Sequence, residues 1–136
     1  MTEIQFEIQQ YYAVQMRCLD NGDADGFAAT FTEDAVFVHD PGETVEGRSA
    51  IAAATKINVA RVREARTVRR HWFGMMIIEP DSDSQIRTQY TAITTSTMAD
   101  GTTALGTGSL VEDVLVRHGG QLSTASRTVH SDRVAR

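Results

Sequence analysis

The chain has 136 residues, of which 41% are hydrophobic and 23% are charged, and its formal net charge is −5. This length and composition predict one globular domain over residues 1–136. The mild acidic excess argues against a nucleic acid or an anionic membrane surface as a partner. No apolar run approaches the roughly 20 residues that span a bilayer. The single cysteine, Cys18, excludes an internal disulfide, and the N-terminal residues lack a secretory-signal pattern, which together predict a cytoplasmic protein.

Helical patterns dominate the first half of the chain. Apolar residues recur at spacings of three and four from Ile4 to Leu19, which predicts an amphipathic helix that ends at the turn Asp20–Asp23. Asp23 is expected to cap a short second helix that carries Phe27 and Phe31 and closes over residues 32–34. Residues 35–39 are typical of a strand that Pro41 stops. Ser49 is then expected to cap a third helix over residues 50–66.

The second half of the chain is rich in Thr, Val, Ile and aromatic residues, as strands are. Hairpin-like joints separate four such segments, which are Thr67–Glu79, Ile86–Met98, Thr103–Val116 and Leu122–Val134. Consecutive hairpins predict an antiparallel meander, and helices followed by strands indicate the α+β class. We therefore expect a curved antiparallel sheet whose concave side is closed by the N-terminal helices, as a cone-shaped pocket.

A series of short motifs along the chain resembles a known family. They are Arg17–Asp23, Gly26-Phe27, Phe31, Glu33–Phe37, Gly47–Ile51, Arg70–Trp72, Asp81–Asp83, Gly119-Gly120 and Ser126–Val129. In order and spacing they are similar to the SnoaL-like branch of the nuclear-transport-factor-2-like superfamily. The resemblance implies a cystatin-like α+β cone with a deep apolar pocket for a small organic ligand. The superfamily includes polyketide cyclases, scytalone dehydratase and ketosteroid isomerase, and also non-catalytic β subunits of ring-hydroxylating dioxygenases, so the site must be argued from its residues.

The resemblance implies a catalytic pair, Asp20 at the end of the first helix and His71 on the first long strand. A carboxylate that accepts from one imidazole nitrogen fixes its tautomer and leaves the other nitrogen free to move a proton. The alternative is structural, with Asp20 as part of the helix stop and His71 packed on a sheet face. Tyr12 and Met16 precede Asp20 by eight and four residues, so one helix face can present all three to a ligand.

Strict alternation along the first long strand predicts what accompanies His71. Phe73 and Met75 would share its face and line the pocket, as would Ile77. Trp72, Met76 and Ile78 would form an apolar patch on the opposite face, which predicts a homodimer.

Asp40 is a second candidate base, because the resemblance places the general base of ketosteroid isomerases at this strand end. An aspartate before proline is more often a turn residue, and its neighbour His39 is expected to face away. Where the relatives use a tyrosine to donate to the substrate oxygen, this chain has Gln15, and Tyr12 or Tyr90 could substitute for it. Arg127 matches a family arginine, which would bind an anionic substrate group or form a salt bridge on the sheet.

The sequence contains no nucleotide fingerprint, phosphate loop or nucleophile motif. Its histidines have no short metal-ligand spacing, so neither a metal nor a cofactor is expected. We predict a cofactor-free cyclase, dehydratase or isomerase that acts on a polyketide-like or polycyclic molecule in antibiotic biosynthesis. The alternative is a non-catalytic ligand-binding or subunit-stabilising module.

Overall fold

The computed structural model describes residues 2–134. Its helices are α1 (Glu3–Asp20), α2 (Ala24–Ala29) and α3 (Arg48–Glu64). Its strands are β1 (Phe31–Asp40), β2 (Thr44–Glu46), β3 (Val68–Pro80), β4 (Gln85–Thr97), β5 (Thr103–Leu105), β6 (Ser109–His118) and β7 (Gln121–Ser131). None of the helices in this part of the chain is long and apolar enough to cross a membrane.

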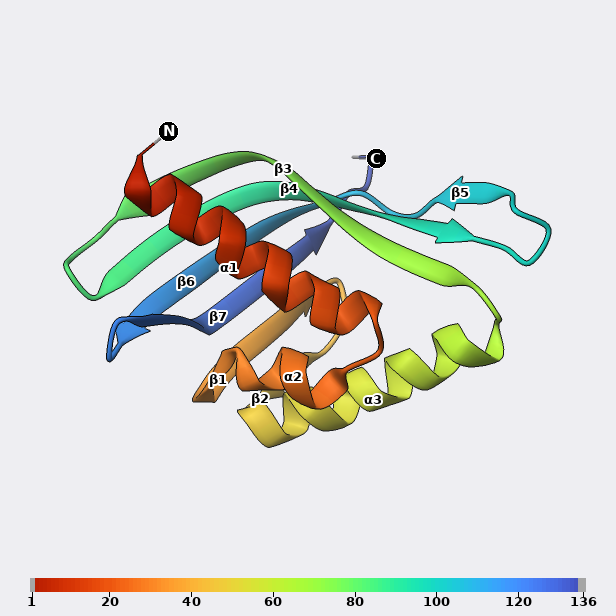
Figure 1. Cartoon of the computed structure of the whole chain (residues 1–136), viewed down its shortest axis with the longest axis horizontal. Coiled ribbons are helices and arrows are strands. Elements are labelled where there is room, and N and C mark those ends of the chain that lie inside the picture. The colour runs from red at the N-terminus through yellow and green to blue at the C-terminus, as the bar shows by residue number, and fades with distance from the viewer. Residues whose placement is uncertain (1, 135–136) are drawn as a thin grey trace.

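The strands form one sheet in the order β2-β1-β7-β6-β4-β3, with β5 paired to β4. The predicted hairpins are confirmed, because β3, β4, β6 and β7 pair antiparallel in succession. β1 instead runs parallel to β7, so the sheet is mixed rather than wholly antiparallel. Figure 1 shows α1 crossing one face of this curved, open sheet, with α2 and α3 near β1. The predicted α+β class and the curved sheet are therefore confirmed.

Helix α1 begins and ends through local hydrogen bonds that the sequence encodes. Thr2 and Gln5 form a reciprocal capping box at its start. At its end the N–H of Asn21 donates to the carbonyl of Arg17, and Gly22 follows with a φ of +80°. The face carrying Ile8, Tyr12 and Met16 is buried and fixes the helix against the sheet.

Three predicted boundaries are wrong, each for a local reason. Helix α2 ends at Ala29, and Phe31 begins β1 because the carbonyl of Thr30 already accepts from Thr124 of β7. Helix α3 begins directly after Gly47, which has a φ of +92°, without a side-chain cap from Ser49. The segment expected as one strand over residues 103–116 divides into β5 and β6 around Gly106 and Gly108.

A β-bulge in β3 reverses the predicted orientation of its second half. The register of β3 against β4 shifts between Gly74 and Ile77, and Met75 has a φ of +53°. A bulge inserts one extra residue and so changes which residues share a face. As a result Met76 and Ile78 pack on the core, whereas Met75 is 86% and Ile77 is 54% exposed.

A buried polar network joins α1 to the sheet. Arg127 donates from Nε and Nη2 to the two carboxylate oxygens of Asp113, at 3.0 Å each. Tyr12 of α1 and Tyr90 of β4 both donate to the same carboxylate, at 2.6 and 3.0 Å. The carbonyl oxygen of Gln15 accepts from Arg127 at 2.6 Å. Each of these groups thus has a partner, as burial requires.

The charges in this network stabilise one another. Burial acts to lower the pKa of the Arg127 guanidinium, but Asp113, together with Tyr90 and Tyr12, outweighs burial and raises this pKa. Burial, reinforced by Asp113, raises the pKa of Tyr12 well above its usual value, so that its hydroxyl stays protonated and donates. The network therefore depends on Arg127 remaining opposite Asp113.

We predict that Arg127→Met lowers the free energy of unfolding by about 3–5 kcal/mol, because it leaves the Asp113 carboxylate buried without its cation. Urea titrations at one fixed protein concentration measure this loss. The control is Arg87→Met, which breaks the exposed pair of Arg87 with Asp81 and should cost less than about 1 kcal/mol. Equal losses in the two variants would contradict the assigned role of Arg127.

Candidate active site

A cavity of about 630 Å³ lies between the sheet, the end of α1 and helix α3. This volume lies within the range of about 300–1,000 Å³ that is usual for small-molecule sites. Apolar side chains of all three helices and of β1 and β3 contribute to its walls, among them Met16, Leu19, Phe27, Phe37, Ile51 and Phe73. The predicted pocket with apolar walls is therefore present.

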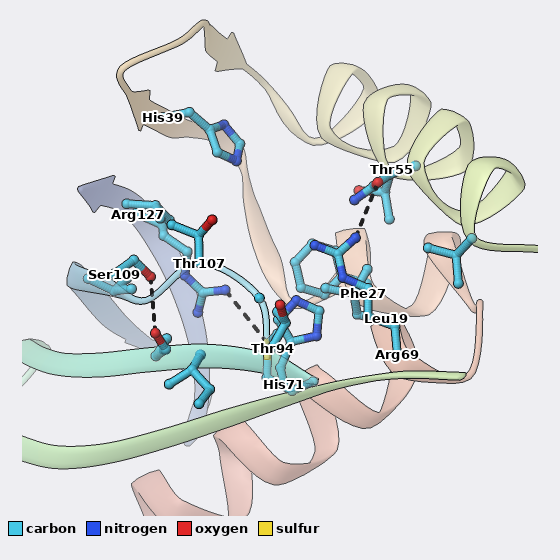
Figure 2. Close-up of a pocket in the computed structure, with 18 of the residues that line it drawn as sticks. Leu19, Phe27, His39, Thr55, Arg69, His71, Thr94, Thr107, Ser109 and Arg127 are labelled. Carbon is cyan, nitrogen blue, oxygen red and sulfur yellow. Dashed lines mark hydrogen bonds between the residues drawn. The ribbon is translucent and has the colours of Figure 1, made fainter. Parts of the chain in front are cut away.

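The end of β4, the segment after β5 and the start of β6 add polar groups to the lining. Thr94, Ser96, Thr107 and Ser109 present hydroxyl groups there, and Figure 2 labels three of these residues. Near the end of α3 and the start of β3 the lining includes Arg61 and Arg69. Within residues 2–134, none of the side chains that line the cavity is acidic.

Asp20 and His71 meet at the edge of this cavity. The Nδ1 atom of His71 lies 2.6 Å from Oδ1 of Asp20, and the backbone N–H of His71 donates to Oδ2 at 3.2 Å. The side chain of His71 is 17% exposed and that of Asp20 is 11% exposed. The predicted contact between Asp20 and His71 is thus confirmed.

The hydrogen bond to Asp20 determines what His71 can do chemically. An ionised Asp20 accepts only, so Nδ1 carries the ring proton and Nε2 presents its lone pair. No side chain of residues 2–134 bonds to Nε2, and His71 lines the cavity. The carboxylate would also stabilise an imidazolium, as a general base requires.

His39 also lines the cavity, contrary to the expectation that it faces away. Its ring stacks on Phe37, with centroids 4.7 Å apart and planes 17° from parallel. Burial lowers the pKa of His39, and Glu43 opposes this shift only in part. This shift favours the neutral form of the imidazole.

Asp40 points to the opposite face of the sheet, because successive strand residues alternate. Its carboxylate oxygens lie 3.1 Å from Nδ1 of His130 and 3.1 Å from a guanidinium nitrogen of Arg133. The hydrogen bond from His130 holds the pKa of Asp40 below its usual value. Asp40 therefore does not line this cavity, unlike the position expected for a base that acts on a ligand there.

The other predicted ligand contacts divide into two groups. Met16, Phe73, Tyr90 and Arg127 line the cavity as expected, although the polar groups of Tyr90 and Arg127 are already bonded to Asp113. Tyr12 and Gln15 lie behind this lining, in the buried network, and Met75 is exposed on the outer face because of the bulge.

The sequence does not predict that His39 and Phe37 line the cavity, nor that hydroxyl groups gather on one of its walls. Alternation from Ala35 through Phe37 to His39 was the available signal for the first two. Nothing in the sequence indicated that Thr107 and Ser109 would meet Thr94 and Ser96. Among residues 2–134, no group of three or more His, Cys, Asp or Glu side chains is arranged to hold a metal ion.

Three solved structures are similar to this chain over nearly its whole length. Aln2 from a Streptomyces species is 36% identical, with 97% of this chain and 93% of that chain covered and a TM-score of 0.91. ActVI-ORFA from Streptomyces coelicolor is 34% identical, with 98% and 100% covered and a TM-score of 0.89. A protein from Catenulispora acidiphila in complex with S-DNPA is 37% identical, with 95% and 93% covered and a TM-score of 0.82.

More distant comparisons bear on the fold and the family. An NTF2-like protein with a cystatin-like fold from Novosphingobium aromaticivorans is 18% identical, with 93% of this chain and 80% of that chain covered and a TM-score of 0.80, and it shows the fold alone. No protein with a curated description matches the chain significantly. The family model of the SnoaL-like domain matches residues 2–128. The chain therefore belongs to the SnoaL-like family.

Proposed function

We propose that this protein is a cofactor-free acid–base enzyme that removes a proton next to a carbonyl group of a fused-ring, polyketide-like ketone. The observation that carries the proposal is the Asp20–His71 hydrogen bond of 2.6 Å at the edge of an apolar cavity. Dehydration, cyclisation and isomerisation of such ketones can all begin with this step. The likeness to Streptomyces proteins and to a protein complexed with S-DNPA supports a small-molecule substrate. A role in antibiotic biosynthesis in the cytoplasm remains a prediction.

In the proposed reaction Nε2 of His71 takes the proton from the carbon next to the carbonyl. Asp20 holds the ring in the required tautomer and stabilises the imidazolium that forms. For a ketone with a hydroxyl group on the next carbon, the enol then expels that hydroxyl with one proton as water. A C–H bond and a C–O bond break, and a C=C bond forms. A positioned base of this kind contributes a rate factor of about 10²–10⁴.

The cavity walls would supply binding and orientation. Apolar surface buried against Phe27, Phe37 and Phe73 contributes affinity of about 25 cal/mol per Å². The hydroxyl groups of Thr94 and Ser96 can bond the oxygens of the substrate and so select one orientation of a flat ring system.

A non-catalytic ligand-binding or subunit-stabilising role is the second candidate. It is favoured by the absence of a free phenol among the cavity-lining groups of residues 2–134, since the hydroxyl of Tyr90 is bonded to Asp113. Gln15, which stands where relatives have the donor tyrosine, is fully buried and bonded to Arg127. Binding without turnover would distinguish this role from the enzyme.

We predict that His71→Ala lowers turnover at least about 100-fold while ligand affinity changes little, because the imidazole acts mainly in the transition state. The assay substrate is 3-hydroxy-1-tetralone, whose loss of water gives the fluorescent product 1-naphthol. Activity should survive a chelator. The matched control is His118→Ala, in the exposed hairpin between β6 and β7.

Thermal melting must first show that His71→Ala is folded, because the replacement leaves a hole. A folded variant with turnover within about threefold of the wild type would contradict the role of His71, since such a change is worth less than about 1 kcal/mol.

We also propose that a second copy of this chain covers the outer face of the sheet. Trp72, Met75 and Ile77 are 57%, 86% and 54% exposed there, and the helices lie on the other side (Figure 1). The sequence predicts Met76 and Ile78 on this outer face. Because of the bulge, Met75 and Ile77 are exposed there instead. An exposed apolar patch beside paired charges, such as Arg87 with Asp81, suits a two-fold dimer in which the patch of one copy packs on that of the other.

We predict that sedimentation at micromolar concentration gives a dimer and that the double variant Met75→Lys, Ile77→Lys is monomeric. Trp72 is the only tryptophan, so its emission should shift to longer wavelength on dissociation. Val14→Lys, which changes an exposed apolar residue of α1, is the control and should remain dimeric. A monomeric wild type would refute the dimer.

A further inference from the structure

The proposed function leaves one chemical requirement without a residue. When His71 removes a proton next to a carbonyl, negative charge develops on the carbonyl oxygen, and a nearby hydrogen-bond donor is needed to stabilise it. The sequence suggested Gln15, Tyr12 or Tyr90 as this donor. All three polar groups are bonded within the buried network instead.

We infer that His39 is the hydrogen-bond donor to the substrate oxygen, acting from the wall opposite His71. The inference rests on the proposed function and deepens it. Figure 2 shows the two histidines on opposite sides of the cavity. β1 and β3 are separated by β7, β6 and β4 in the sheet, and its curvature turns both inward-facing histidines toward one space. A fused-ring ketone that spans the cavity from one wall to the other would contact both.

The surroundings of His39 suit a donor rather than a second base. Its ring is held by stacking on Phe37 at 4.7 Å, and no side chain of residues 2–134 bonds to either of its nitrogens. His71, by contrast, has a carboxylate partner that stabilises its charged form. A neutral imidazole always has one N–H to donate, and a neutral histidine can polarise a carbonyl group in this way.

Other cavity-lining donors are less suited to this role. The hydroxyl of Thr55 already donates to the carbonyl of Ile51 at 2.7 Å, and Ser109 donates to that of Ala92 at 3.5 Å. The guanidinium of Arg127 is bonded to Asp113 and Gln15. Thr94, Ser96 and Thr107 remain as lining hydroxyl groups on another wall, and Thr107 provides the comparison.

The first test measures turnover of 3-hydroxy-1-tetralone by His39→Leu, His39→Gln and Thr107→Val. Loss of one donor to a developing oxyanion typically costs about 10²–10³ in rate. We expect a loss of this size in His39→Leu, at least tenfold recovery in His39→Gln because its amide N–H can donate, and little change in Thr107→Val. Turnover that is unaltered in His39→Leu but lost in His71→Ala would overturn the role of His39 and leave the proposed function standing.

The second test does not depend on turnover and so separates failure of the two proposals. It compares the affinities of 1-naphthol and of naphthalene, which lacks the oxygen, in the wild type and the same variants. One hydrogen bond should favour 1-naphthol by about threefold to tenfold. We expect His39→Leu to abolish this preference and Thr107→Val to keep it. A preference that persists in His39→Leu would overturn the inference, even if the protein proves inactive.

Discussion

The buried carboxylate of Asp113 accepts hydrogen bonds from Arg127, Tyr12 and Tyr90, and through them it joins helix α1 to the sheet. Arg127 and Asp113 are 4% and 0% exposed, so neither charge can be solvated if the other moves away. Because Tyr12 and Gln15 of α1 bond to this pair, the pair fixes the position of α1 on the sheet and its rotation about its own axis. The position of Asp20, two turns beyond Tyr12 on the same helix, follows from that constraint.

The proposed catalytic pair depends on the same fixed position of helix α1. His71 lies on β3, a long way along the chain from α1, and its ring nitrogen meets Asp20 at 2.6 Å because the network holds the helix in place. The phenol groups of Tyr12 and Tyr90 and the side-chain amide of Gln15 are hydrogen-bonded within this network, so they do not present free polar groups to a substrate. The cavity thus has His71, bonded to Asp20, on one wall and His39 on another. His39 is stacked on Phe37 and has no side-chain partner among residues 2–134, so the proposed roles would separate proton removal from oxygen binding.

The sequence predicted those features that depend on local pattern. The periodicity of α1, the hairpins of β3, β4, β6 and β7, and the contact of Asp20 with His71 follow from spacing and from the family resemblance. Long-range pairing could not be predicted in this way, and the parallel alignment of β1 with β7 is a consequence of where the chain returns to the sheet.

The errors on the two strands β1 and β3 both concern the face of the sheet on which a residue lies. A bulge after Gly74 moves Met75 from the cavity to the outer surface, and no residue pattern identifies a bulge formed by a non-glycine residue at positive φ. The family resemblance indicated Asp40 as the general base, so His39 was expected to face away from the cavity. Alternation along β1 from Ala35 instead places His39 on the cavity side and Asp40 on the opposite face.

The proposed function depends above all on one step, in which Nε2 of His71 removes a proton next to a carbonyl group. The most direct measurement is the exchange of the α-protons of 1-tetralone with deuterium in D₂O, followed by proton NMR, because this ketone has no leaving group and reports proton removal alone. The account predicts exchange well above the buffer rate with the wild type and a loss of that acceleration in His71→Ala. Exchange at the buffer rate with the wild type, or equal acceleration by the folded variant, would contradict it.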